Sequence, residues 1–135
     1  MAPRLVIDAS AALHLALAGK PTPKLARYEL IAPPIFLSER TSSLAAVAFR
    51  TGMPAEVLAD AFDRLEALEV DIQDVDRHHR RAALDLARSL GWAKTYDAEY
   101  VVLAQRLDCA ILTTDGRLTR GAHRLVEMLD PLTLE

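Results

Sequence analysis

Short apolar runs alternate with longer segments of helical pattern along the whole sequence. The first run, Leu5-Val6-Ile7, has the β-branched composition of a strand, and after Asp8 the residues change to helix formers that end at Gly19 and Pro21. The same alternation predicts further strands at residues 30–32, 70–72, 109–112 and 126–129. Helices are predicted at residues 9–17, 36–50, 54–68, 77–90 and 97–107, with a short one after Gly116.

This order of elements predicts the fold class. Strands that alternate with helices form a parallel sheet covered on both faces, joined by right-handed crossovers. We therefore expect an α/β fold, a three-layer sandwich with a central parallel sheet flanked by helices. No linker, repeat or low-complexity tract divides the chain, so residues 1–135 are predicted to form a single domain. In such sheets the functional site lies outside the carboxyl ends of the strands.

Composition narrows the class of protein. Of the 135 residues, 51% are hydrophobic and 26% are charged, which suits a folded domain with a sizeable core. A single cysteine, Cys109, cannot form an internal disulfide, which favours a reducing compartment. The N-terminus reaches a charge after three apolar residues, too few for a signal peptide, and no apolar run has membrane-spanning length. We expect a cytoplasmic protein that does not associate with membranes.

Four acidic side chains stand where this fold places its functional residues. Asp8 ends the first predicted strand and Asp115 follows the strand at 109–112, while Glu39 and Asp97 lie near the starts of two helices. Carboxylates that converge in a partly desolvated cleft repel one another unless they are protonated or a cation neutralises them. Oxygen ligands alone select Mg²⁺ or Mn²⁺ over zinc or copper.

Each acid taken singly also has a simpler explanation. Acidic residues near helix starts commonly cap the helix or complement its dipole, which applies to Glu39 and Asp97. Asp115, followed by glycine, is an ordinary turn residue. Asp8 is the exception, because a charge directly after a buried strand is unusual without a partner. The joint pattern favours a functional role over four unrelated caps and turns.

The segments around these acids resemble a known family. They are Val6-Ile7-Asp8-Ala9-Ser10, Ala32-Pro33-Pro34-Ile35-Phe36-Leu37-Ser38-Glu39, Tyr96-Asp97-Ala98-Glu99-Tyr100-Val101-Val102-Leu103-Ala104 and Leu112-Thr113-Thr114-Asp115. In order and spacing they resemble the four acidic motifs of PIN-domain ribonucleases, and within that family the VapC toxins of bacterial type II toxin–antitoxin systems. The resemblance spans nearly the whole chain and implies a PIN-like fold.

The resemblance implies a site. Its catalytic, metal-binding acids would be Asp8, Glu39, Asp97 and Asp115, with Ser10 and Thr113 as polar residues supporting them. The cofactor would be Mg²⁺, with Mn²⁺ as the alternative, bound as one ion or two. Arg40 departs from the pattern, since the family usually carries an aliphatic residue after the glutamate. It would pair with Glu39 or reach substrate phosphate.

The resemblance also implies an activity and partners. We expect a Mg²⁺-dependent endoribonuclease, the toxin of a toxin–antitoxin pair, with a cognate antitoxin and RNA as partners and a homodimer as its assembly. The formal net charge is -3, but removing the four acids from the 19 Asp and Glu leaves 15 against 16 Lys and Arg. Local basic residues can therefore contact RNA phosphates. The candidates are Arg40, Lys94, Arg117, Arg120 and Arg124.

Two other functions are also consistent with the sequence. One is a catalytically silent PIN-like scaffold that binds RNA or protein, and another is a structure-specific DNA nuclease. A ribonuclease using paired imidazoles is disfavoured, because His78 and His79 lie among arginines on a predicted solvated helix face. Trp92 and Tyr100 are interpreted as packing residues. No glycine-rich phosphate loop or dinucleotide fingerprint is present in the sequence.

Overall fold

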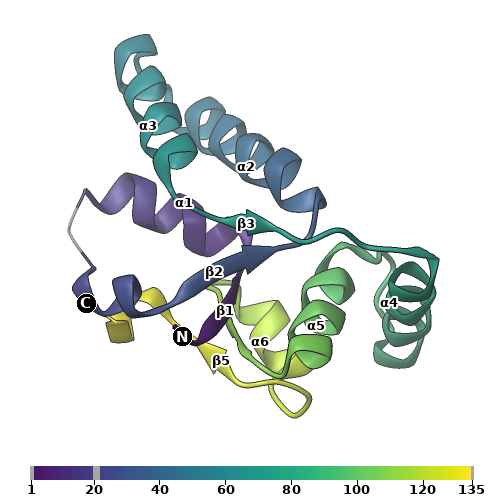
Figure 1. The fold of residues 1–135 in the computed structure, drawn as a ribbon. Coiled ribbons are helices and arrows are strands. Elements are labelled where there is room, and N and C mark those ends of the chain that lie inside the picture. Colours follow the sequence, from purple (N-terminus) through teal and green to yellow (C-terminus); the bar gives the residue numbers. More distant parts are fainter. Residues whose placement is uncertain (1, 20–21, 135) are drawn as a thin grey trace.

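The computed structural model describes residues 2–19 and 22–134. Its centre is a five-stranded sheet in the order β3-β2-β1-β4-β5, in which every neighbouring pair is parallel (Figure 1). The strands are β1 (Arg4–Ile7), β2 (Glu29–Ala32), β3 (Asp71–Ile72), β4 (Ala110–Leu112) and β5 (Met128–Leu129). The predicted α/β fold with a central parallel sheet flanked by helices is confirmed.

The helices form two groups around this sheet. They are α1 (Ala9–Ala18), α2 (Ile35–Thr51), α3 (Ala55–Ala67), α4 (Arg77–Leu90), α5 (Tyr96–Leu107) and α6 (Gly116–Ala122). Helices α1, α2 and α3 pack on one another, while α5 packs on β1 and β4 and carries α4 on its outer side (Figure 1). Two 3₁₀ helices, η1 (Pro23–Arg27) and η2 (Pro131–Leu134), are too short to leave a periodic pattern and were not predicted.

The central strand explains where the site forms. Leu5, Val6 and Ile7 of β1 are completely buried, as expected for a parallel strand covered on both faces. Ile7 is in register with Leu112 of β4, and the Asp8 backbone N–H donates to the Leu112 carbonyl at 3.2 Å. The register therefore brings the residues that follow β1 and β4 together at the carboxyl edge of the sheet.

Within the described ranges, no helix combines the length and apolar composition needed to cross a bilayer.

Candidate active site

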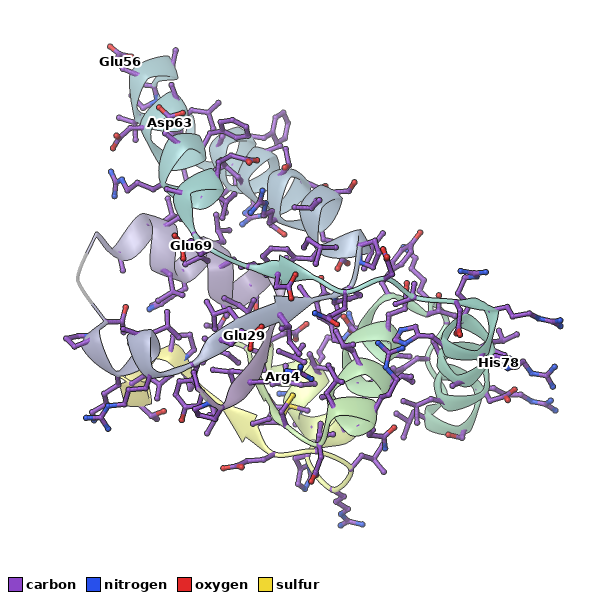
Figure 2. All side chains as sticks on the ribbon, in the orientation of Figure 1. Arg4, Glu29, Glu56, Asp63, Glu69 and His78 are labelled. Atoms are coloured by element: carbon purple, nitrogen blue, oxygen red, sulfur yellow. The ribbon has the colours of Figure 1, made fainter. Side chains whose placement is uncertain are left out.

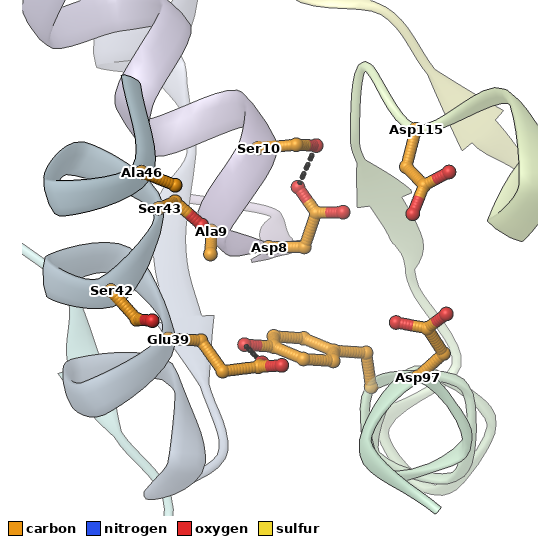
Figure 3. Close-up of a pocket in the computed structure, with 10 residues that line it drawn as sticks. Asp8, Ala9, Ser10, Glu39, Ser42, Ser43, Ala46, Asp97 and Asp115 are labelled. Carbon is orange, nitrogen blue, oxygen red and sulfur yellow. Dashed lines mark hydrogen bonds between the residues drawn. The ribbon is translucent and has the colours of Figure 1, made fainter. Parts of the chain in front are cut away.

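Four acidic side chains from separate segments line one pocket of about 320 Å³ at this edge (Figure 3). Asp8 lies between β1 and α1, and Asp115 lies between β4 and α6. Glu39 comes from the second turn of α2 and Asp97 from the first turn of α5. The structure thus brings the four sequence-predicted acids together, which four independent caps or turns would not do.

Asp8 is the most deeply placed of the four, with 6% of its surface exposed. Its Oδ1 accepts hydrogen bonds from Ser10 Oγ at 2.7 Å and from the Ala11 N–H at 2.9 Å, so it also caps α1. Its Oδ2 accepts from Thr113 Oγ1 at 2.5 Å. Burial raises the pKa of the Asp8 carboxyl to about 6, although these hydrogen bonds favour the ionised form.

Ser10 and Thr113 connect the two chain segments that carry the aspartates. Ser10 Oγ accepts from the Thr114 N–H at 3.0 Å and lies 3.2 Å from Thr113 Oγ1. Thr113 Oγ1 in turn accepts from the Asp115 N–H at 2.9 Å. The two predicted supporting hydroxyls therefore fix the β4–α6 turn against the start of α1.

The Asp115 side chain both caps α6 and lines the pocket. Its Oδ1 accepts from the backbone N–H groups of Arg117 at 2.9 Å and Leu118 at 3.4 Å, which caps α6. The capping explanation from the sequence therefore holds for one oxygen. The same side chain lines the pocket (Figure 3), so the cap also fixes the direction of the carboxylate.

The Glu39 side chain is held in place by Tyr100, which the sequence predicted only as a packing residue. The buried Tyr100 donates its hydroxyl to Glu39 Oε1 at 2.6 Å (Figure 3). Burial, with the negative charges of Asp97 and Asp8, raises the pKa of Glu39, and the Tyr100 hydrogen bond opposes that rise. The sequence held one signal for this role: Tyr100 lies one helical turn after Asp97, on the same face of α5.

Asp97 is half-buried opposite Asp115. Burial raises the pKa of the Asp97 carboxyl, the negative charge of Asp115 raises it further, and the nearby Arg117 lowers it. Three of the four carboxyls are thus harder to ionise than usual, because the pocket gathers like charges in a partly desolvated place. A bound cation would relieve that penalty.

The possible metal ligands in this pocket suit a hard, hydrated cation. Its acidic side chains offer carboxylate oxygens, which are ligands that Mg²⁺ and Mn²⁺ prefer. Across residues 2–19 and 22–134, no three His, Cys, Asp or Glu side chains are grouped closely enough to hold a metal ion by themselves. Mg²⁺ does not need such a cage, because it keeps several waters and binds through one or two carboxylates. The residues therefore fit Mg²⁺ held partly by water, with Asp8 and Asp97 as the strongest candidates for ligands.

Arg40 does not serve the site as predicted. Its side chain is 5% exposed, its Nη2 lies 2.9 Å from Glu66 Oε1, and its Nη1 donates to the Leu65 carbonyl at 3.3 Å. The guanidinium also lies 5.3 Å from the centroid of the Phe36 ring. Arg40 therefore joins α2 to α3, and the prediction that it pairs with Glu39 is wrong. Its burial and its pairing with Glu66 disfavour the predicted contact with RNA phosphate, which stays a prediction.

The other predicted phosphate contacts are exposed. Lys94 and Arg117 lie close to Asp97, in a cleft that adjoins the acidic pocket. Arg120 lines a different hollow beside Thr114, at the turn between β4 and α6. Among the histidines, His79 is buried against α5, so the predicted solvated face of α4 is wrong at that position.

Comparison with known proteins agrees with the fold. The PIN domain family model matches residues 5–124. PAE2754 from Pyrobaculum aerophilum is similar in structure, with a TM-score of 0.71 and 23% identity over 99% of this chain and 95% of that chain.

SSO1118, a PilT N-terminus domain protein from the archaeon Sulfolobus solfataricus P2, has a TM-score of 0.51 and 17% identity over 97% of this chain and 89% of that chain. Curated proteins provide no match. PIN domains are commonly nucleases and typically use divalent metals. With 120 of its residues covered by the family model, this chain belongs to the PIN-domain family.

Proposed function

We propose that this chain is a Mg²⁺-dependent endoribonuclease that acts as the toxin of a toxin–antitoxin pair. The observation that carries the proposal is the convergence of Asp8, Glu39, Asp97 and Asp115 on one pocket, where none of the described residues that line the walls is cationic. Three of these carboxyls have a raised pKa, so the pocket favours an added positive charge.

The proposed hydrolysis follows from the carboxylates that would bind the metal ion. A bound divalent ion lowers the pKa of a coordinated water and neutralises charge on the leaving oxygen of a phosphodiester. Asp8 and Asp97 would hold the ion, Glu39 would be kept in place by Tyr100, and Asp115 would complete the pocket. Because water is the nucleophile, the ribose 2′-OH is not consumed. The products then carry a 5′-phosphate and a 3′-hydroxyl.

Cleavage assays on RNA, single-stranded DNA and branched DNA, each with Mg²⁺, Mn²⁺ or excess chelator, test this proposal. We expect RNA cleavage with either ion, none in chelator, and none with Asp8→Asn. Asp63→Asn is the matched control, since Asp63 is exposed on α3 away from the pocket (Figure 2). Cyclic phosphate ends, or full activity in chelator, would contradict the mechanism. Preference for branched DNA would instead identify a structure-specific DNA nuclease, and no cleavage of any substrate would favour a scaffold.

The toxin role is supported by the four motifs and predicts a cognate antitoxin. An arginine from such a partner could enter the acidic pocket and replace the cation. Helix α3 leaves Val57 and Phe62 exposed while burying Ala61 and Leu65, which favours it as part of a homodimer contact. We expect expression of the wild-type chain, but not of Asp8→Asn, to arrest growth, and sedimentation to give twice the 14.8 kDa mass of one chain.

A further inference from the structure

A second cleft opens beside the acidic pocket and shares two of its residues. Its volume is about 410 Å³, and Glu39 and Asp97 form the wall common to both hollows. The remaining side chains of interest are Trp92, Lys94, Tyr96 and Arg117. We call these four residues the aromatic cleft. They come from the segment joining α4 to α5, the first residue of α5 and the first turn of α6.

The indole of Trp92 is fixed in its position. A Cβ atom on Gly121 of α6 would lie 2.6 Å from Trp92 Cζ2, so the ring occupies space that only a glycine leaves open. The Trp92 backbone N–H donates to the Ala87 carbonyl at 2.8 Å, which fixes the main chain as well. The side chain is half-buried, so part of the ring packs in the interior and part lines the cleft.

Tyr96 is the second aromatic residue that lines the cleft. Its side chain is 46% exposed and precedes Asp97 directly in the sequence. A single exposed aromatic residue needs no explanation. Here, however, aromatic residues make up only 5% of the chain, and two of them line one hollow beside four carboxylates.

The two cations of the cleft are also accessible. Lys94 and Arg117 are exposed, and the positive charge of Arg117 opposes part of the rise in the pKa of Asp97 that burial and Asp115 cause. Neither residue has a salt bridge among the described parts of the chain. Positive charge is thus available in a cleft that shares Glu39 and Asp97 with the acidic pocket.

Aromatic rings beside cations recognise a particular form of nucleic acid. Unpaired bases stack on aromatic side chains, and the neighbouring phosphates bind Lys and Arg. Bases within a duplex are already stacked on each other and do not offer a free face. The cleft therefore fits a single-stranded nucleotide rather than the surface of a double helix.

We propose that the aromatic cleft binds the nucleotide next to the scissile phosphate by stacking its base on aromatic side chains. The base would stack on Tyr96 and the exposed part of Trp92, and Lys94 and Arg117 would contact its phosphate. This inference rests on the proposed nuclease function and names the residues of that site that would hold an unpaired nucleotide. It adds a binding role to Trp92, whose predicted packing role agrees with its contact with the core.

The chain contains a built-in reporter for this proposal, because Trp92 is its only tryptophan. The probe is a short single-stranded oligoribonucleotide, titrated into metal-free protein so that no cleavage occurs. We expect saturable quenching of Trp92 fluorescence, and affinity at least about tenfold weaker for the same strand paired to its complement. Tyr96→Leu should weaken binding about tenfold, which lies within the roughly 5- to 150-fold that stacking of one base on an aromatic side chain contributes. Tyr96→Phe should bind like the wild type.

Controls separate stacking from general effects. Phe49→Leu removes another exposed aromatic side chain, 90% exposed on α2, and should leave binding unchanged. Replacing Lys94 and Arg117 together by glutamine should reduce the salt dependence of binding, because fewer phosphates are neutralised. In cleavage assays with Mg²⁺, Tyr96→Leu should raise KM about tenfold and change kcat less than about twofold.

The outcomes distinguish this inference from the proposed function. RNA cleavage with binding that neither quenches Trp92 nor depends on Tyr96 would overturn the aromatic cleft and leave the nuclease intact. Equal affinity for duplex would overturn it as well. Tyr96-dependent quenching without cleavage under any condition would support the cleft and refute the nuclease.

Discussion

Asp8 and Arg40 are both buried charged residues, but the chain treats them in opposite ways. Arg40 has a counterion in Glu66, a carbonyl acceptor at Leu65 and the face of an aromatic ring. Asp8 has only neutral hydrogen-bond donors, and the nearest charge that affects it, Asp115, has the same sign. A buried charge that is neutralised from within the chain can be tolerated by the fold alone, whereas a buried charge left without a counterion indicates a ligand from outside.

The largest expected effect comes from removing the unneutralised charge. Asp8→Asn keeps a side chain able to cap α1 but cannot hold a cation in the same way. We expect RNA cleavage to fall about 1000-fold, the loss of several kcal/mol of transition-state stabilisation. Without metal at pH 7 the variant should be as stable as the wild type or more stable. A variant that unfolds instead would show that Asp8 is structural.

The pH dependence of metal-free stability is the second test. The pKa of Asp8 is raised to about 6 in the folded state, from 3.8 in the unfolded chain, so the folded state binds the proton more tightly. Stability should therefore rise as the pH falls from 7 to 4, by on the order of 2 to 3 kcal/mol. Urea denaturation at each pH would measure this. Asp8→Asn should remove the part of this rise that belongs to Asp8 and leave the part due to the raised pKa values of Glu39 and Asp97. An unchanged profile in that variant would refute the assignment to Asp8.

Removing the counterion of Arg40 should destabilise the fold, whereas removing the charge of Asp8 should not. Glu66→Gln leaves Arg40 buried without its counterion, and we expect the free energy of unfolding to fall by about 2 kcal/mol. Thermal denaturation measures the change. Asp85→Gln is the matched control, because the Arg81–Asp85 pair is exposed and should contribute less than about 1 kcal/mol. Equal effects of the two substitutions would contradict the structural role of Arg40.

The smallest of these effects concerns Tyr100. Tyr100→Phe keeps the packed ring but removes the hydrogen bond to Glu39. Outer residues that orient a ligand typically alter metal affinity or activity 10- to 100-fold, and we expect about tenfold weaker cleavage here. Raising the Mg²⁺ concentration should restore part of the activity. Unchanged activity at low Mg²⁺ would mean that Glu39 is positioned without Tyr100.

The features that depend on the local sequence pattern could be predicted from the sequence. Alternating β-branched runs and helical segments were sufficient for the parallel sheet, and the placement of Asp8 and Asp115 after strands was sufficient to bring them to one edge. Burial of Arg40 and His79 was missed, because it depends on the packing of α2 on α3 and of α4 on α5. The Tyr100 hydroxyl and the aromatic cleft were missed for the same reason. Glu39 is 61 residues from Tyr100, and the cleft depends on Arg117 and Gly121 of α6 as well as on the neighbouring Trp92, Lys94 and Tyr96.

Calorimetric titration of metal-free protein with Mn²⁺, a stand-in for Mg²⁺, tests the central claim most directly. We predict saturable uptake by the wild type and by Asp63→Asn, and strongly weakened uptake by Asp8→Asn and Asp97→Asn. No uptake by the folded wild type, or equal uptake by all four proteins, would contradict the claim that these carboxylates form a cation site.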